Sequence, residues 1–205
     1  MIESPASPRE RILDEIDRHD GYVRDRQVRA AGIDSRLLAR LVEEGEIERV
    51  RRGLYRRAGA WSAHIGLADA VASAPHAVVC LLSALEYYGL TTTAPPEVYL
   101  AIPRKARPPH LDYPPVHVIR YNERMFAYGI IAQTLDDGGA AARMYSREKS
   151  IADALHFRDR IGRDIGIEAL RAYLGQPRRD VDELLRAADV CRVRPLMTSY
   201  LEVVL

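Results

Sequence analysis

The sequence predicts an α+β protein with two domains: a winged helix-turn-helix over residues 1–60, and a mixed α/β domain over residues 61–205 that ends in helices. Three observations lead to this prediction. The first sixty residues show three helical patterns followed by an alternating, arginine-rich hairpin. The composition breaks over residues 58–64, Ala-Gly-Ala-Trp-Ser-Ala-His. Beyond that break, strand patterns give way to a run of helical patterns, and a length of 205 residues fits one or two domains.

The first predicted helix begins at Ser7-Pro8, because a capping hydroxyl followed by proline is typical of a helix start. Its apolar residues share one face: Ile12, Leu13 and Ile16. Gly21 can take the left-handed conformation that ends a helix, so we expect the end near Asp20-Gly21. Tyr22-Val23 then reads as a short extended link.

Two further helices are expected on either side of a sharp turn at Gly32. The first covers Arg26–Ala30 with Val28 facing inward, and the second runs from about Ser35 to Glu44. Asp34-Ser35 can cap the second of these helices. An apolar stripe follows its inner face: Leu37, Leu38, Leu41 and Val42.

A hairpin follows, since the apolar period changes from that of a helix to that of a strand. Residues 47–50 alternate, Arg51-Arg52-Gly53 can make a tight turn, and Leu54-Tyr55-Arg56 can return as the second strand. Five arginines and no acid lie between Arg49 and Arg57, although the whole chain has a formal net charge of only +1. A focused basic patch of this kind is what phosphate binding requires.

The second domain is expected to mix strands, helices and one long loop. The proline-rich segment Pro103–Pro115 carries three basic residues and is the expected loop. Strands are predicted at Val98–Ile102, Val116–Tyr121 and Gly129–Thr134, and helices at about Leu67–Ser73, Ser83–Tyr88, Ser146–Arg160, Ile167–Leu174, Val181–Val190 and Pro195–Val204.

The third helix of the first domain is predicted to contact duplex DNA. The major groove admits one helix that buries one face on its own domain and presents polar side chains on the other. Arg36 and Arg40 share the outer face, and backbone N–H groups at the helix start can meet a phosphate. The hairpin would lie along a flanking backbone or minor groove. The predicted DNA-binding residues are Ser35, Arg36, Arg40, Arg49, Arg51, Arg52, Tyr55 and Arg56.

Two observations keep the alternative of an ordinary solvated arginine face open. An arginine pair on one helix is common on protein surfaces. Four acidic residues near the predicted interface would also repel phosphates unless they point away or pair with arginines: Glu43, Glu44, Glu46 and Glu48.

No catalytic constellation is found, so the sequence predicts a binding protein and not an enzyme. It has no glycine-rich phosphate loop, nucleophile elbow or paired zinc-ligand spacing, and its six histidines are scattered. Cys80 and Cys191 read as buried thiols, and Asp136-Asp137 beside two glycines reads as a turn. No metal and no cofactor is therefore expected. No apolar run approaches the roughly 18 residues of a membrane span, which together with the polar start predicts a cytoplasmic protein.

With these residues identified, the chain resembles the AbiEi family of antitoxins, regulators found beside nucleotidyltransferase toxins. Val28–Gly45 and Arg49–Tyr55 are similar to the family's winged-helix pattern, with an Ala-Gly turn before the recognition helix and an Arg-Gly-x-Tyr hairpin. Downstream, the similar segments are Ser83–Leu85, Gly89-Leu90, Val98–Pro103, Tyr145–Asp153 and Ile167–Leu174.

The resemblance implies that the first domain binds inverted repeats in its own promoter and represses the operon. The second domain would counteract a cognate nucleotidyltransferase toxin, with or without stable contact. Since one winged helix covers one half-site, two copies would be needed, meeting as a homodimer on DNA or before binding. The residues suggested for the antitoxin surface are Arg104, Lys105, Arg107, Arg147, Lys149 and Arg158.

Three points about this second domain stay open at the level of sequence. Lys149 and Asp153 are four residues apart, which indicates an ion pair on a helix surface. The chain could act mainly by direct binding to the toxin, with little or no role for DNA. A metal-dependent activity of the second domain is the remaining alternative, and it would depend on Asp136 and Asp137.

Overall fold

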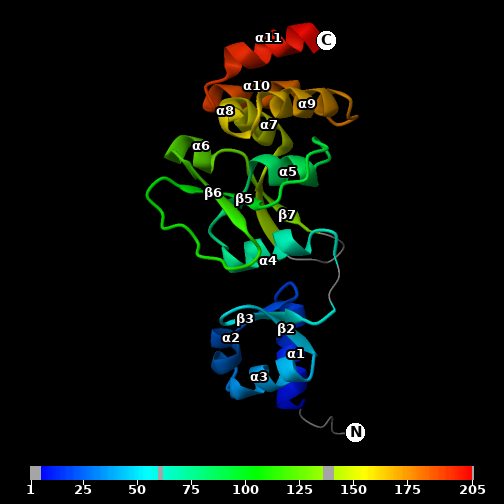
Figure 1. Ribbon diagram of the computed structural model, residues 1–205, viewed down its shortest axis with the longest axis vertical. Helices are drawn as coiled ribbons and strands as arrows, with labels where there is room; N and C mark the ends of the chain where they lie inside the picture. The colour runs from blue at the N-terminus through cyan, green and yellow to red at the C-terminus, as the bar shows by residue number, and fades with distance from the viewer. Residues whose placement is uncertain (1–5, 60–61, 136–140, 205) are drawn as a thin grey trace. The chain divides into compact units, whose positions relative to one another are not determined.

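The computed structural model describes residues 6–59, 62–135 and 141–204, and it confirms the predicted α+β class with helices at the C-terminal end. The chain divides into two compact units (Figure 1). The first comprises Met1–Ser73 with the short segments Leu111–Pro114 and Thr134–Ala141. The second comprises Ala74–His110, Pro115–Gln133 and Ala142–Leu205.

The first unit has three helices on one side of a small sheet (Figure 1). The antiparallel strands lie in the order β1-β3-β2, so Tyr22–Arg24, expected as a link, is in fact the third strand. The elements are α1 Pro8–Arg18, β1 Tyr22–Arg24, α2 Asp25–Ala30, α3 Arg36–Glu43, β2 Ile47–Arg51, β3 Leu54–Arg57 and α4 Ile65–Ser73.

The helix α1 begins at the residues that the sequence predicts. The Ser7 hydroxyl accepts from the Glu10 N–H and the Glu10 carboxylate accepts from the Ser7 N–H, so α1 starts with a capping box. One apolar cluster then joins the helices to the sheet: Ile12, Ile16, Val23, Val28, Ile33, Leu38, Leu41 and Ile47. Burial of these side chains fixes how α3 faces the rest of the unit.

The second unit is built on a five-stranded sheet in the order β6-β5-β4-β8-β7. β5 pairs parallel with β6 and antiparallel with β4, and β4 pairs parallel with β8. The strands are β4 Val78–Val79, β5 Val98–Pro103, β6 Val116–Tyr121, β7 Ile130–Thr134 and β8 Ala141–Tyr145. The helices are α5 Leu81–Tyr87, α6 Glu123–Ala127, α7 Arg147–His156, α8 Arg158–Ile161, α9 Arg163–Leu174, α10 Val181–Val190 and α11 Arg194–Val204.

Two features of the second unit differ from the sequence prediction. The helix expected over residues 146–160 is two helices, α7 and α8, which meet at Phe157. The ring of Phe157 lies 5.2 Å from that of Tyr121, so the break places an aromatic side chain against the core. The strand β8 and the five-residue helix α6 were not expected, and the turn predicted at Asp136-Asp137 lies outside the described residues.

Neither a group of metal ligands nor a membrane-spanning helix occurs in the part of the chain that the structure describes. Within residues 6–59, 62–135 and 141–204, no three His, Cys, Asp or Glu residues gather as metal ligands would. In the same part of the chain, no helix has the length and apolar character needed to cross a membrane.

Candidate nucleic-acid interface

The helices α2 and α3 form a helix-turn-helix whose inner side is apolar. Val28, Leu38 and Leu41 are fully buried, and Ile33 fills the turn between the helices. The turn itself closes at Gly32, whose φ of 71° lies in the left-handed region that glycine favours. The Ile33 N–H then donates to the Val28 carbonyl, which fixes the direction in which α3 leaves the turn.

The outer face of α3 carries the two arginines that the sequence singled out. Arg36 and Arg40 are both exposed, four residues apart and opposite the buried leucines. Arg40 makes an exposed ion pair with Glu44, with Nε 2.7 Å from Oε1. A pair this exposed contributes well under about 1 kcal/mol, so Arg40 can leave it for a stronger partner at little cost.

The first turn of α3 is arranged differently from the prediction. Ser35 makes no capping bond, and the Asp34 carboxylate accepts from the Arg36 N–H at 2.9 Å instead. The N–H groups of Leu37 and Leu38 donate to the backbone carbonyls of Asp34 and Ser35. Because these donors are occupied and a carboxylate stands beside them, the helix start is poorly suited to an anion.

The hairpin β2–β3 presents two exposed arginines. Arg49 lies on β2 opposite Tyr55, and Arg52 lies in the turn beside Gly53, whose φ is 75°. The register shifts between Arg49 and Arg51, so a bulge places Arg51 opposite Leu54 on the other face. There the Arg51 Nε is buried, and none of the described residues forms a hydrogen bond with it.

Two predicted DNA-binding residues of β3 have side chains that contact other residues of the first unit. Tyr55 packs against the apolar cluster beneath the sheet. Arg56 has a side chain only 18% exposed, with Nη2 2.6 Å from Glu48 Oε2 and Nε 3.8 Å from Asp69 Oδ1. The structure therefore does not bring Tyr55 and Arg56 to the surface formed by Arg36 and Arg40.

A polar cluster explains why Arg56 is held inward. Tyr22 and Glu48 flank Arg56 on one face of the sheet, and α4 brings Asp69 against them. The Tyr22 hydroxyl donates to Asp69 Oδ1 at 2.8 Å, and burial raises the pKa of that carboxyl although Tyr22 and Arg56 oppose the shift. This cluster attaches α4 to the face of the sheet opposite α1, α2 and α3.

Replacing Arg56 is expected to lower stability and not DNA affinity. Arg56→Ala leaves the buried Asp69 without its cation, so we expect a loss of about 1–3 kcal/mol in the free energy of unfolding, measured by urea titration. The matched control is Arg57→Ala, which removes an exposed pair with Asp17 and should cost below about 1 kcal/mol. Equal effects of the two substitutions would contradict the interior role of Arg56.

The acidic residues near the interface are mostly paired. Glu44 contacts Arg40, Glu46 contacts Arg9, and Glu48 contacts Arg56. Glu43 is exposed on the outer part of α3. Pairing neutralises Glu46 and Glu48, whereas Glu44 loses its partner if Arg40 turns to DNA.

Arg26 is exposed on α2, although it is not among the DNA-binding residues predicted from the sequence. It precedes the buried Val28 by two residues, so the helical period puts it on the outer side. The two-residue spacing between Arg26 and Val28 is the sequence pattern that could have identified Arg26 as exposed. The exposed arginines of the helix-turn-helix and hairpin are therefore Arg26, Arg29, Arg36, Arg40, Arg49 and Arg52. Two of them are paired, Arg29 with Asp25 and Arg40 with Glu44.

The six residues suggested for an antitoxin surface do not share one surface. Arg104, Lys105 and Arg107 are exposed in the loop after β5. Arg147 and Arg158 are half-buried and donate to Gln176 and to the Leu155 carbonyl.

Lys149 is fully buried, which corrects its placement on a surface. The predicted pair with Asp153 exists, but it lies on a helix enclosed by α5, α9 and α10. The Lys149 ammonium is 4.2 Å from the centre of the Tyr145 ring and 5.0 Å from that of Tyr121.

Comparisons with known proteins agree with the helix-turn-helix and hairpin. Residues 10–58, which span α1 to β3, match the family described as "Transcriptional regulator, AbiEi antitoxin". No curated protein matches the chain. Among solved structures, the chain is similar to the RV2827C protein from Mycobacterium tuberculosis, with a TM-score of 0.53 and 14% sequence identity. The match covers 96% of this chain and 81% of that protein. At this identity the similarity concerns the fold alone. The similarity to the AbiEi antitoxin family of transcriptional regulators therefore covers residues 10–58, the helix-turn-helix and the hairpin.

Proposed function

We propose that this protein represses its own operon by binding inverted repeats upstream of its gene, and that its C-terminal part counteracts a cognate nucleotidyltransferase toxin. In this proposal, residues 1–60 are the DNA-binding domain and residues 61–205 the antitoxin domain, and both act in the cytoplasm. Binding without catalysis accounts for both tasks.

The proposal that this protein binds DNA is supported mainly by the outer face of α3. Arg36 and Arg40 project from a helix whose opposite side is fixed by buried leucines, so their backbone positions are rigid. A guanidinium can bind guanine or phosphate with two parallel hydrogen bonds. Arg49 and Arg52 of the hairpin supply exposed cations for a flanking backbone.

Two copies of the chain are needed to read an inverted repeat, because each contains one helix-turn-helix. The half-sites would then lie about one helical turn of DNA, or a multiple of it, apart. We propose that the copies meet on DNA as a homodimer.

The experiment that tests the proposal is a gel-shift titration of the full-length protein against the DNA directly upstream of its gene. Scrambled DNA of equal length and composition is the control, and the titration is run at two salt concentrations. We expect tight binding that prefers the upstream DNA and weakens with salt, since contacts to phosphates release counterions.

If the folded protein binds upstream and scrambled DNA equally weakly, the proposal that it is a repressor is wrong. Direct binding to the toxin would then be the leading function, and co-purification of the two proteins would be its test. Neutralisation itself is tested separately, by growth of cells that express the toxin with and without this protein.

A further inference from the structure

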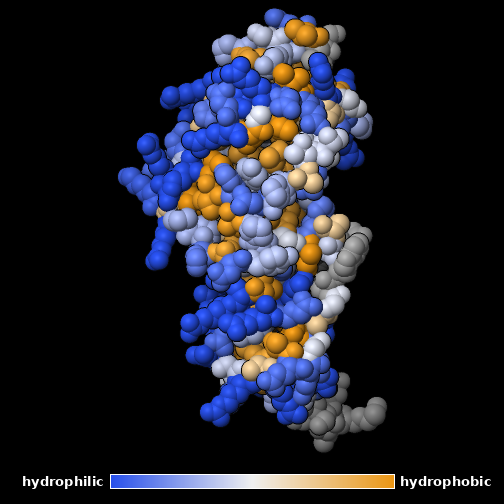
Figure 2. Space-filling view, in the orientation of Figure 1, coloured by the Kyte–Doolittle hydropathy of each residue, from blue (hydrophilic) through white to orange (hydrophobic). Residues whose placement is uncertain are grey.

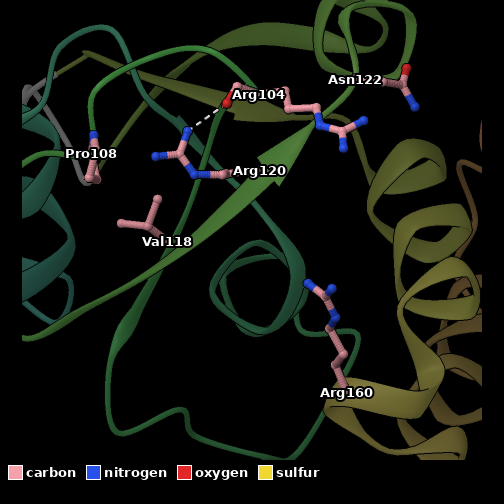
Figure 3. A pocket seen from close by; sticks show the side chains of 6 residues that line it. All are labelled: Arg104, Pro108, Val118, Arg120, Asn122 and Arg160. Carbon is pink, nitrogen blue, oxygen red and sulfur yellow. Dashed lines mark hydrogen bonds between the residues drawn. The ribbon is translucent and has the colours of Figure 1, made fainter.

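A basic cavity of about 530 Å³ lies in the second unit, beside the loop that joins β5 to β6 (Figure 3). The loop contributes Arg104 and Pro108, the end of β6 contributes Arg120, and α8 contributes Arg160; Val118 and Asn122 complete the lining. A neighbouring cavity of about 330 Å³ shares Arg104 and Asn122 and adds Lys105. Four cationic side chains from three separate segments thus surround adjoining spaces.

The three arginines of the larger cavity have no carboxylate partner in the part of the chain that the structure describes. Arg120 uses Nη1 to bind the carbonyls of Arg104 and Ala106, at 2.6 and 2.8 Å, which fastens the loop beside the cavity. The guanidinium of Arg160 lies over the Phe157 ring at 5.6 Å. The nearest acid in sequence, Asp159, pairs with Arg163 instead.

The polar groups that remain in the larger cavity are donors. Asn122 Oδ1 accepts from the Met125 N–H at 3.0 Å as the cap of α6, and the amide N–H groups remain as donors. Among the described residues, no aspartate or glutamate lines this cavity, although Glu123 lines the neighbouring one. Guanidiniums that face one space without an anion repel one another, and a bound anion would relieve that repulsion.

From this arrangement we propose that the cavity binds the phosphate groups of a nucleotide, either free or within single-stranded nucleic acid. Planar guanidiniums bind phosphate oxygens with two hydrogen bonds each, and three of them can share more than one phosphate. The volume falls within the roughly 300–1,000 Å³ of sites for whole small molecules, larger than a lone phosphate needs.

The cavity also has an apolar part that a sugar or base can cover. Pro108 and Val118 form this part of the lining (Figure 3). In the space-filling view, hydrophilic surface over the β5–β6 loop and over α8 borders hydrophobic surface near β6 (Figure 2). This site goes beyond the proposed function, because operator binding by the first unit does not require it.

The test is isothermal titration calorimetry of the full-length protein with ATP, with inorganic pyrophosphate and with a short single-stranded oligonucleotide. Arg104→Ala and Arg160→Ala each remove one exposed guanidinium from the cavity, and we expect each to weaken binding about tenfold or more. Arg160→Lys keeps the charge but loses the two-pronged geometry, so it should fall between the wild type and Arg160→Ala.

The matched control is Arg163→Ala, an exposed arginine three residues from Arg160 that does not line the cavity. It should bind as the wild type does. Circular dichroism confirms that every variant is folded, which is expected because the replaced side chains are exposed.

The outcomes separate the two sources of phosphate. Saturable binding of ATP and pyrophosphate that depends on Arg104 and Arg160 identifies a free nucleotide. Binding of the oligonucleotide alone, with the same dependence, identifies nucleic acid as the source. The proposal is overturned if none of the three probes binds, or if all variants bind equally. Operator binding by the first unit is measured independently on duplex DNA, so one proposal can fail without the other.

Discussion

Replacing Lys149 with methionine is expected to cost about 3–5 kcal/mol of the free energy of unfolding. The Lys149 ammonium contacts both carboxylate oxygens of Asp153, at 2.5 and 2.6 Å, and both side chains are fully buried. Methionine fills a similar volume but leaves Asp153 as an unpaired charge in the core. Urea titration followed by circular dichroism measures the loss.

Apart from Lys149, the side chains that influence Asp153 belong to Cys191 and Tyr121, and neither carries a positive charge. The Cys191 thiol donates to Asp153 Oδ1 at 3.2 Å, which is a weak bond beside that of an ammonium. Burial raises the pKa of Asp153, and Lys149 is the largest influence that opposes this shift. Without Lys149, the carboxyl must take up a proton or remain charged in the core, and either change lowers stability.

Two further variants make the Lys149 prediction decisive. The chain has two lysines, and Lys105→Met, at an exposed position, should change stability by less than about 0.5 kcal/mol. The double replacement Lys149→Met with Asp153→Leu removes both charges and should recover most of the loss, because apolar residues often replace a buried ion pair without penalty. A single Lys149→Met that is as stable as Lys105→Met would show that the pair does not hold the core.

The sequence predicted elements with a long, regular apolar period and missed the short ones. Leu38 and Leu41 mark the inner face of α3, and residues 181–190 give the bounds of α10. By contrast, Tyr22–Arg24 is too short to show alternation, so β1 was expected only as a link. β8, Ala-Ala-Arg-Met-Tyr, has no β-branched residue, and pairing with β4 makes it a strand.

Which arginines face solvent depended on tertiary structure more than on local pattern. The bulge between Arg49 and Arg51 changes the face on which Arg51 lies, and α4 covers the face that carries Arg56. The inward position of Arg56 could have been anticipated, since Arg56 follows the buried Leu54 by two residues and alternate residues of a strand share one face. The burial of Lys149 also depends on tertiary structure, because a Lys–Asp spacing of four residues predicts an ion pair but does not indicate whether the pair is buried.

Replacing Arg36 and Arg40 together is expected to weaken binding to upstream DNA by about 2–4 kcal/mol, roughly 30- to 1,000-fold. Each guanidinium can supply a two-pronged contact to a base, worth about 1–3 kcal/mol of discrimination. Arg40 must first leave Glu44, which reduces its net contribution slightly. The measurement is a gel-shift titration of Arg36→Ala/Arg40→Ala against upstream and scrambled DNA.

Comparison with the hairpin separates base recognition from general attraction. If α3 reads bases, the double variant should lose its preference for upstream DNA. Arg49→Ala/Arg52→Ala should instead weaken binding to all sequences and lower the slope of log affinity against log salt by about 0.9 for each phosphate that the hairpin no longer neutralises. Arg18→Ala, an exposed arginine of α1 paired with Glu15, is the matched control and should bind as the wild type does. Unchanged preference in the Arg36/Arg40 variant would remove α3 from the interface, because its outer face has no other arginine.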